Sequence, residues 1–400
     1  MAGRVVITGL GIFCGAGKDI PSFTSALLEG RSGVGPIDLF DVSEFPSHIG
    51  VQVKDFDPAS HFGSRTARKL SRADQFGLIA AGEAVESSGL SGACDPYEVG
   101  VVVGAGAAGM MDAEQWLAAR LAGAPGSPSL LRGALPDKTG TVIASAFGFA
   151  GYQGTITTAC SSSATAIGWG ADLVRSGRLK AAVCGGSDTL SILTYAGFNS
   201  LKVVSPELCS PFSLERKGIT LGEGAAFMVL EDEEHAARRG APVLGSILAY
   251  AAAGEAHHMT APEPTGSVAT RMMREAIDRS GVELAEIGWV NAHGTGTPLN
   301  DAVESGVVKR VFGEQAARVP LVSVKPVTGH CLGAAGAIEA VSTVVALNNR
   351  TIPATLNFRG RDPECDLDYC HDGARKSEAR VALSNSFAFG GNITCLVIGG

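Results

Sequence analysis

The sequence changes from a strand pattern to a helix pattern within Tyr152-Gln-Gly-Thr-Ile-Thr-Thr-Ala-Cys-Ser-Ser-Ser-Ala-Thr-Ala-Ile-Gly-Trp169. Threonines that alternate with apolar residues predict a strand over 155–159, and the Ala- and Ile-bearing run after it predicts a helix over 162–176. Gly177 is placed to end that helix. A strand that passes directly into a helix is the repeating unit of an α/β fold.

Cys160 lies at the turn between this strand and this helix. Unbonded amides and the positive end of the helix dipole favour a thiolate at such a position. We therefore expect the pKa of this thiol to lie below its ordinary value of about 8.5, so that it acts as a nucleophile without a dedicated base. Any other cysteine of the nine is expected to be an inert, buried side chain.

The α/β pattern extends outward from this turn in both directions. Further strands are predicted by apolar runs at 5–9, 99–103, 181–184, 225–230, 287–292, 321–324, 381–385 and 394–398. Helical periodicity separates them at 74–87, 268–280, 301–312 and 337–347. The polar segment 231–242 ends in Gly and Pro and predicts a boundary between two comparable halves, 1–240 and 241–400.

Two histidines occur in similar settings near the ends of predicted strands. His293 lies in Asn291-Ala-His-Gly-Thr-Gly-Thr-Pro298, and His330 lies in Ser323-Val-Lys-Pro-Val-Thr-Gly-His-Cys-Leu-Gly-Ala-Ala-Gly336. The glycines that follow each one let the backbone turn tightly and approach a ligand. Two such imidazoles can donate N–H bonds to one developing oxyanion, or they can divide the roles of acid and base.

Composition excludes several classes of protein. The chain has 400 residues, of which 45% are hydrophobic and 18% charged, as in an ordinary globular protein. It contains no apolar run of about 18 to 20 residues and no signal-peptide pattern at its start, so we expect a cytoplasmic protein that does not enter a membrane. Nine cysteines without a Cys-x-x-Cys pair favour reduced thiols, and a net charge of −8 disfavours nucleic-acid binding.

No cofactor or metal site is expected from the motifs. Gly104-Ala-Gly-Ala-Ala-Gly109 matches a dinucleotide pattern, but no acidic residue follows at the required distance of about 20 residues. Gly11-Ile-Phe-Cys-Gly-Ala-Gly-Lys18 has the wrong spacing for a phosphate loop, and Asp19 replaces its Ser or Thr. Cys365 and Cys370 have no second ligand pair and predict a surface loop.

One segment is strongly cationic, although the chain as a whole carries a net negative charge. Its four cations, Arg65, Arg68, Lys69 and Arg72, have the spacing of one stripe on a helix. Like charges at this spacing destabilise an isolated helix by about 0.2 to 0.5 kcal/mol per pair. The stripe is therefore either a solvated face or a docking site for an anionic partner.

Four motifs in order resemble the elongating β-ketoacyl-[acyl-carrier-protein] synthases. They are Thr-Ala-Cys-Ser-Ser-Ser at Cys160, the His293 and His330 segments quoted above, and Asn385-Ser-Phe-Ala-Phe-Gly-Gly-Asn392. The likeness spans nearly the whole chain. It implies a thiolase-like fold, in which a duplicated αβαβα arrangement forms five layers, and a homodimer, with a heterodimer of related subunits as the alternative.

The resemblance also implies the roles of the site residues. Cys160 would take an acyl chain from a carrier-protein thioester, and His293 and His330 would hold malonyl-carrier protein and promote its decarboxylation. Lys325 would be their electrostatic partner. The backbone amides of Cys160 and Phe389 would receive the oxyanion, and the Phe389 loop would open as a gate.

Other positions are implied to hold the substrate and the carrier protein. The phosphopantetheine arm, which arrives on the carrier protein so that no bound cofactor is needed, would bond to Thr295 and Thr297. Ala107 and Phe387 would line the substrate pocket, and the cationic stripe would dock the acidic carrier protein. A structural monovalent cation is implied near Glu339, Asn291, Ser384 and Asn385, with a buried ion-paired glutamate as the plain alternative.

Departures from the family pattern affect substrate choice. Many relatives have Arg-Pro-Phe-Asp-x-x-Arg-Asp-Gly-Phe in place of Ser210-Pro-Phe-Ser-Leu-Glu-Arg-Lys-Gly-Ile219. Ala107 is smaller than its usual counterpart, which predicts room for a longer or stiffer acyl chain. The competing functions are a chain-length-factor-like partner subunit, which generally lacks the cysteine, and a thiolase-type enzyme using coenzyme A esters. The sequence leaves fatty-acid and polyketide or polyene pathways open.

Overall fold

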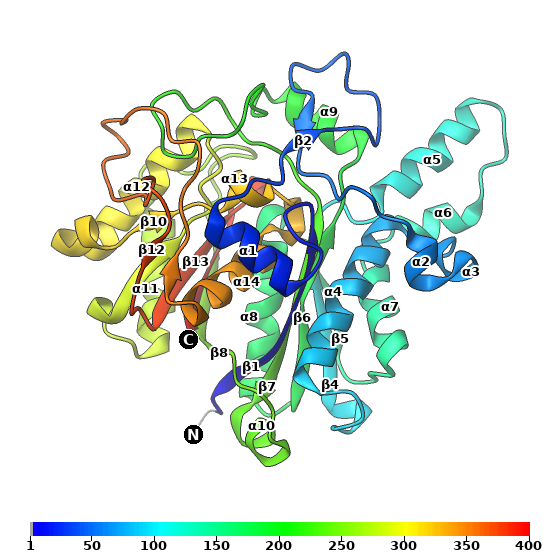
Figure 1. The fold of residues 1–400 in the computed structure, drawn as a ribbon, viewed down its shortest axis with the longest axis horizontal. Coiled ribbons are helices and arrows are strands. Elements are labelled where there is room, and N and C mark those ends of the chain that lie inside the picture. The colour runs from blue at the N-terminus through cyan, green and yellow to red at the C-terminus, as the bar shows by residue number, and fades with distance from the viewer. Residues whose placement is uncertain (1–2) are drawn as a thin grey trace.

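Two helices, α8 (Ser162–Arg175) and α14 (Ala335–Asn348), lie side by side at the centre of the computed structural model, which describes residues 3–400 (Figure 1). Residues 335–347 of α14 are all buried. A helix that is apolar on every side is stable only when other elements surround it. Strands therefore cover this central pair on both sides, and further helices cover the strands.

The main sheet repeats one strand order in the two halves of the chain. In the described residues it has ten strands, in the order β10-β9-β13-β14-β8-β1-β7-β6-β4-β5. Their bounds are β1 Val5–Cys14, β4 Val99–Gly104, β5 Gln153–Ile156, β6 Ala181–Asp188, β7 Gly224–Asp232, β8 Gly245–Gly254, β9 Ile287–Asn291, β10 Leu321–Val322, β13 Val381–Phe387 and β14 Asn392–Gly399. The halves meet where β1 pairs with β8, at Val6–Ser246 and Ile7–Gly245.

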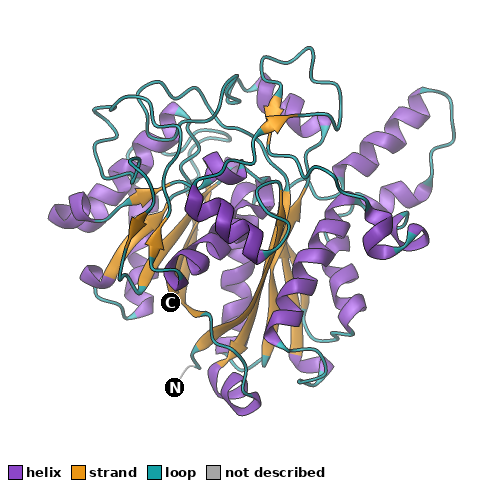
Figure 2. Cartoon of the chain, in the orientation of Figure 1, coloured by secondary structure: helices purple, strands orange, loops and turns teal. Residues whose placement is uncertain are grey.

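Helices form the two outer layers, as Figure 2 shows. On the first half, α4 (Arg72–Ser88) packs on β1 and β7, and α7 (Lys138–Phe147) packs on α4. On the second half, α11 (Ser267–Ser280) packs on β8 and β14, beside α12 (Pro298–Phe312). The remaining helices are α1 Ile20–Glu29, α2 Pro58–Phe62, α3 Ser64–Ala67, α5 Met110–Leu121, α6 Pro128–Gly133, α9 Ile192–Ser200, α10 Glu233–Arg239 and α13 Lys325–Thr328.

Two strand pairs lie outside the main sheet. They are β2 (Gly35–Pro36) with β3 (Ile49–Gly50), and β11 (Thr351–Ile352) with β12 (Arg375–Lys376). None of the described helices combines the length and the apolar character that a bilayer crossing requires.

The α/β class predicted from the sequence is confirmed, with differences in single elements. Strand β8 was not predicted, and β10 is shorter than the predicted 321–324 because Val324 leaves the extended region to begin α13. The predicted boundary between 240 and 241 coincides with the link from α10 to β8, but it stays a prediction.

Candidate active site

Cys160 lies in a short 3₁₀ helix, Ala159–Ser161, that leads directly into α8. Strand β5 ends at Ile156 rather than at Ala159, and the next residues leave the extended region, with ψ 43° at Thr158 and φ 50° at Ala159. Two serines fix this turn: Ser162 Oγ accepts the Thr158 N–H at 2.9 Å, and Ser161 Oγ donates to the Thr158 carbonyl at 2.9 Å. The thiol is therefore held in one place, with 6% of the residue exposed.

The pKa of Cys160 differs from the sequence-based prediction. Burial raises it to about 12, although the charge of Lys325 and an N–H bond from Phe389 act in the opposite direction. The prediction of a lowered pKa is wrong for this closed cavity, because the loss of hydration outweighs the favourable charges around the sulfur. The resting thiol is neutral, so its proton must be transferred during the attack.

Alkylation of Cys160 should therefore keep accelerating at high pH. Below its pKa the thiolate fraction rises tenfold per pH unit, so the rate with iodoacetamide should increase from pH 7 to above pH 10 without a plateau. Mass spectrometry of the labelled peptide measures this rate, with Cys160→Ser as the control for the other cysteines. A plateau below pH 8 would contradict the raised pKa.

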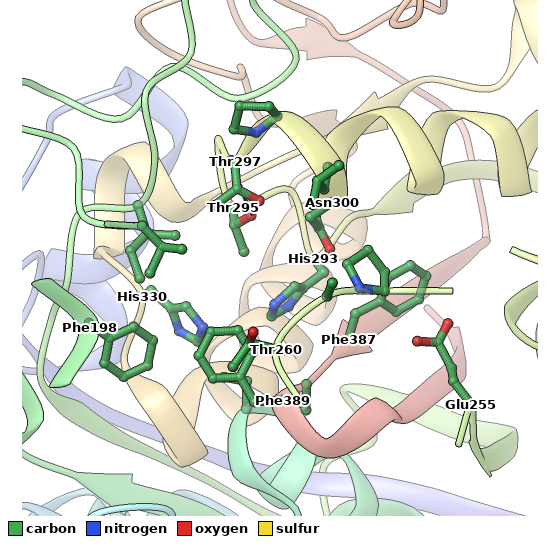
Figure 3. Close-up of a pocket in the computed structure, with 18 residues that line it drawn as sticks. Phe198, Glu255, Thr260, His293, Thr295, Thr297, Asn300, His330, Phe387 and Phe389 are labelled. Carbon is green, nitrogen blue, oxygen red and sulfur yellow. Dashed lines mark hydrogen bonds between the residues drawn. The ribbon is translucent and has the colours of Figure 1, made fainter. Parts of the chain in front are cut away.

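The two histidines come together beside the cysteine, although they are far apart in sequence. His293 follows β9, and His330 follows α13, which β10 leads into. Their ring centroids lie 5.3 Å apart and their planes are nearly perpendicular, at 87°. Both rings and Cys160 line one cavity, where Figure 3 shows the imidazoles facing its interior.

Hydrogen bonds assign the same tautomer to both rings. The Leu332 N–H donates to Nδ1 of His330 at 3.2 Å, and Lys325 Nζ lies 3.3 Å from Nδ1 of His293. Because each Nδ1 accepts, each Nε2 carries the proton and can donate to a ligand in the cavity. The arrangement therefore provides two N–H donors that can act on one oxygen atom.

Burial and a nearby cation keep these rings neutral. Burial lowers the pKa of His293 and of His330 well below the ordinary value, and the charge of Lys325 lowers both further. Lys325 is itself buried, with its Nζ bonded to the His293 carbonyl and to the carboxylate of Glu339. A neutral imidazole donates one N–H from Nε2 and requires no counter-ion.

The cavity has a volume of about 280 Å³ and two different walls. One wall is polar: Thr295 and Thr297 bond to each other through their hydroxyls, at 2.9 Å. The opposite wall is apolar and includes Phe198, Phe387 and Phe389 (Figure 3). A slender ligand with amide groups along it and a reactive end near Cys160 fits this arrangement.

The comparisons with known proteins agree with this geometry. The model of the β-ketoacyl synthase N-terminal domain matches residues 2–236, and that of the C-terminal domain matches residues 244–359. The chain is 37% identical to 3-oxoacyl-[acyl-carrier-protein] synthase 2 from Synechocystis sp., over 98% of this chain and 97% of that protein. The chain belongs to the β-ketoacyl synthase family.

Solved structures extend the similarity of this synthase to three dimensions. The ishigamide ketosynthase/chain length factor superposes with a TM-score of 0.95 at 35% identity, over 100% of this chain and 99% of that one. A type II polyketide ketosynthase, solved in complex with its acyl-carrier protein, gives 0.91 at 28% identity, over 100% of both chains. The predicted family and its thiolase-like fold are confirmed, and the synthase is an acyltransferase that forms carbon–carbon bonds.

The segment around Phe389, which is predicted to act as a gate, is held by contacts that the sequence did not indicate. The Phe389 ring stacks on Phe198 of α9, with centroids 5.5 Å apart. Gly390 and Gly391 have φ of 82° and 74°, which glycine adopts without strain. The Gly390 N–H donates to the Met259 carbonyl at 2.8 Å. These contacts keep Phe389 over the cavity in this state.

Glu304 is a second residue that sequence reasoning missed. Its buried carboxylate accepts the N–H groups of His293 and Gly294, at 2.9 and 2.8 Å. It thereby fixes the turn that orients the His293 ring. No local motif marks this role, because Glu304 lies on α12, one turn beyond the glycine loop that it holds.

Five buried oxygen atoms on β9, β13 and α14 have no hydrogen-bond partner among the described residues, although the Asn385 amide donates to Glu304 of α12. They are Asn291 Oδ1, Glu339 Oε2, Ser384 Oγ, Asn385 Oδ1 and Ser386 Oγ, all buried. The strand ladder pairs Asn291 with Ser384, and the Asn291 amide donates to the Glu339 carbonyl at 2.9 Å. Such oxygens fit a cation. No cluster of three or more His, Cys, Asp or Glu ligands occurs within residues 3–400.

The cationic stripe is not one helical face, contrary to the sequence prediction. Helix α3 ends at Ala67, and Ser71 begins α4 as a capping residue, so the chain bends between Arg68 and Arg72. Arg72 is only 17% exposed in its side chain, because its guanidinium binds the buried carboxylate of Glu223. Its guanidinium is therefore engaged within the fold, and its assignment to a docking surface stays a prediction.

The other predicted residues lie where they were expected or outside the cavity. Arg65, Arg68 and Lys69 are exposed. Ala107 does not line the cavity of Cys160, and it packs instead beside Phe198 in an adjacent apolar cluster. Its assignment to an acyl pocket remains a prediction.

Proposed function

We propose that this synthase joins an acyl group on Cys160 to malonyl-[acyl-carrier protein], releasing CO₂ and 3-oxoacyl-[acyl-carrier protein]. The observation that carries the proposal is the pair of neutral Nε2–H donors of His293 and His330 in the cavity of Cys160. Relatives named 3-oxoacyl-[acyl-carrier-protein] synthase share this chain's full length. A chain-length-factor-like subunit would not require this complete set of reactive side chains.

In the first half-reaction Cys160 takes the acyl group. Its sulfur attacks the acyl-carrier thioester, and the departing phosphopantetheine sulfur receives the proton that the neutral thiol gives up. The amides of Cys160 and Phe389 would stabilise the tetrahedral oxyanion, and loss of one such donor typically costs about 3 to 4 kcal/mol. The backbone N–H of Phe389 lowers the pKa of Cys160, which supports its place in this pair.

In the second half-reaction the malonyl group loses CO₂. The electron pair of the broken C–C bond moves into an enolate, whose oxygen would accept the two imidazole N–H bonds. The carbanion carbon then attacks the acyl-Cys160 carbonyl, and the thiolate leaves. Thr295 and Thr297 would bond to the phosphopantetheine arm, and a swing of Phe389 away from Phe198 would admit the second substrate.

The test is a reconstitution with purified acyl- and malonyl-carrier proteins. Intact-mass measurement should show acyl transfer to Cys160 and then a 3-oxoacyl product on the carrier. An acyl-enzyme that forms from coenzyme A esters in preference to carrier thioesters would favour the thiolase-type alternative. A series of primer lengths would define the acyl pocket, for which Ala107 predicts tolerance of long or stiff chains.

We also propose that a monovalent cation occupies the cluster of donor-free oxygens at Asn291, Glu339, Ser384 and Asn385. Its charge would satisfy these buried acceptors, which otherwise lack a partner. The role is structural: the cation would support the strand ends on which His293 and Phe387 are mounted. No metal is required for the chemistry.

Arg65, Arg68 and Lys69 are proposed to dock the acidic carrier protein. Alanine at all three should raise KM for carrier substrates about tenfold at low salt and reduce the salt dependence of KM, with kcat little changed. Steady-state kinetics at several ionic strengths measure this effect. Arg72→Ala should instead lower the melting temperature, because it leaves Glu223 buried and unpaired. An unchanged KM in the triple variant would exclude docking at this segment.

We further propose that the synthase works as a dimer, with a second copy or a related subunit. Strand β5 is the outer strand of the main sheet, so its free edge can accept another strand. A matching solved structure is described as a ketosynthase/chain length factor. Mass measurement in solution, alone and with candidate partners, distinguishes homodimer from heterodimer. Location in the cytoplasm stays a prediction.

A further inference from the structure

Asp188 is a buried carboxylate at the end of β6 that the proposed reaction does not use. Its side chain is bonded only to backbone N–H groups. Oδ1 accepts from Ala107 and Ala108, and Oδ2 accepts from Gly106 at 2.8 Å and from Gly333 at 2.5 Å. One side chain thus connects two segments that are more than 200 residues apart in the sequence.

The two connected segments both contain strained backbone. Ala108 has φ 46° and Leu332 has φ 53°, in the left-handed region that residues with a Cβ rarely adopt. Such conformations persist only where surrounding contacts impose them. Asp188 binds the Ala108 N–H itself and the N–H of Gly333, directly after Leu332. Thr189 adds a bond from its hydroxyl to the Ala108 carbonyl, at 3.2 Å.

The two segments are packed so closely that neither can move toward the other. A Cβ on Gly333 would lie 2.3 Å from the Gly106 amide nitrogen, and one on Gly106 would lie 2.9 Å from Asp188 Oδ2. The carboxylate therefore fills the space that the two segments leave between them. Its removal would leave four N–H groups to find other acceptors, and those of Ala108 and Gly333 are buried.

Each segment leads to a different part of the active site. In one, the Leu332 N–H donates to His330 Nδ1 and so fixes the tautomer that aims Nε2–H into the cavity. In the other, Ala107 packs with Leu332 and Phe198 in one apolar cluster, and Phe198 supports the gate residue Phe389. Asp188 is the polar anchor common to both.

We infer that Asp188 is a positioning residue that fixes the His330 turn and the Ala107 loop relative to each other. It thereby couples the position of the Ala107 loop, which is predicted to face the acyl chain, to the orientation of the His330 imidazole. Asp188 bonds to neither substrate nor reacting atoms, so it positions the site through these two backbone segments, and its charge in addition raises the pKa of Cys160. The inference rests on the proposed function.

The main test compares Asp188→Asn with Asp74→Asn. Asparagine keeps the shape of the side chain but replaces one oxygen by a donor, so two of the four N–H groups lose their acceptor. Asp74 is a matched control because it is also a buried carboxylate, which accepts the Ser71 N–H and the Thr139 hydroxyl. It is not among the residues that line the cavity. Both variants should lower the melting temperature.

Only Asp188→Asn should change the chemistry. We expect kcat for malonyl-carrier decarboxylation to fall about 10- to 100-fold, as for a displaced catalytic group, with KM within about twofold of wild type because Asp188 does not touch the Thr295 loop. The distribution of accepted primer lengths should also change. If Asp188→Asn matches Asp74→Asn in kcat and primer distribution, the inference is wrong. If wild type releases no CO₂, the proposed function fails instead.

If Asp188→Asn does not fold, two milder variants still test the inference. Thr189→Val removes the hydroxyl bond to Ala108, and Ala108→Gly relieves the strain of its positive φ. Both leave the carboxylate and the Leu332–His330 bond in place. We expect a changed primer-length distribution with decarboxylation at the wild-type rate. A wild-type distribution in both variants would overturn the role given to the Ala107 loop.

Discussion

Cys160→Ala is expected to abolish acyl loading and to reduce condensation by more than about 1,000-fold, because Cys160 is the one thiol among the residues that line the cavity and the threonine hydroxyls there are far weaker nucleophiles. Decarboxylation of malonyl-carrier protein should survive within about tenfold of wild type, since the imidazole donors do not bond to the sulfur. Intact-mass analysis after incubation with acyl-carrier protein measures loading, and CO₂ release measures decarboxylation.

Cys160→Ser is the matched control for this result. A serine hydroxyl preserves the size and polarity of the position, but it is a far weaker nucleophile in a cavity without a dedicated general base. Loading in the serine variant should therefore be slow, with its fold unchanged. Loading of Cys160→Ala at the wild-type level would place the acyl group elsewhere and would refute the mechanism.

The elements that could be predicted from the sequence are those with a strong local signal. The central helix α14 and the strands β4 and β6 carry apolar runs, and the predicted runs lie within these elements, whereas β5, directly before Cys160, ends three residues earlier than predicted. Strand β8 could not be predicted because its sequence, Gly-Ser-Ile-Leu-Ala-Tyr-Ala-Ala-Ala-Gly, is rich in alanine, which is depleted in strands. Its pairing with β14 and β1 comes from tertiary contacts.

The same distinction applies to the site: local motifs identify some of its residues, whereas contacts with distant segments determine their properties. Cys160, His293, His330 and Lys325 stand in motifs, and the structure brings all four together. The pKa of Cys160 could not be derived from its position at a helix start, because it depends on how completely segments from elsewhere in the chain exclude water. The spacing of Arg72 from the other cations likewise predicts an exposed side chain. Its guanidinium instead binds Glu223, which lies 151 residues away in the sequence, and the side chain is mostly buried.

Glu304, Phe198 and Asp188 have no motif of their own for a related reason. Each acts through a bond or stacking contact with a distant segment: the His293 turn, the Phe389 segment and the Gly333 turn. A buried carboxylate is costly unless it accepts several N–H groups. An acidic residue that belongs to no motif and no predicted surface is therefore a candidate for a buried carboxylate that holds a distant backbone segment.

His330→Ala and His293→Ala should each lower decarboxylation about 100- to 1,000-fold, the usual effect of removing one donor from a developing oxyanion. The double variant should lose less than the product of the two, because both donors act on the same oxygen. Acyl loading of Cys160 should remain, since neither ring is needed as its base. Rates of malonyl-carrier consumption, with loading measured in parallel, separate the two steps.

The pH profile gives an independent check on how these rings act. Because burial and Lys325 lower both pKa values, the rings stay neutral as pH falls through about 6.5, where an ordinary histidine becomes charged. Titration of the two rings should therefore leave the decarboxylation rate constant from pH 8 down past 6.5 and lower it only where the rings gain a proton. A change near pH 7 would instead come from Glu304 and Glu339, whose pKa values burial raises to about 7. Lys325→Ala removes the charge that opposes protonation, so its decline should begin at higher pH. A rate that instead rises as pH falls through 6.5 would mean that an imidazolium is the active form, and the two rings would then be acids rather than neutral donors.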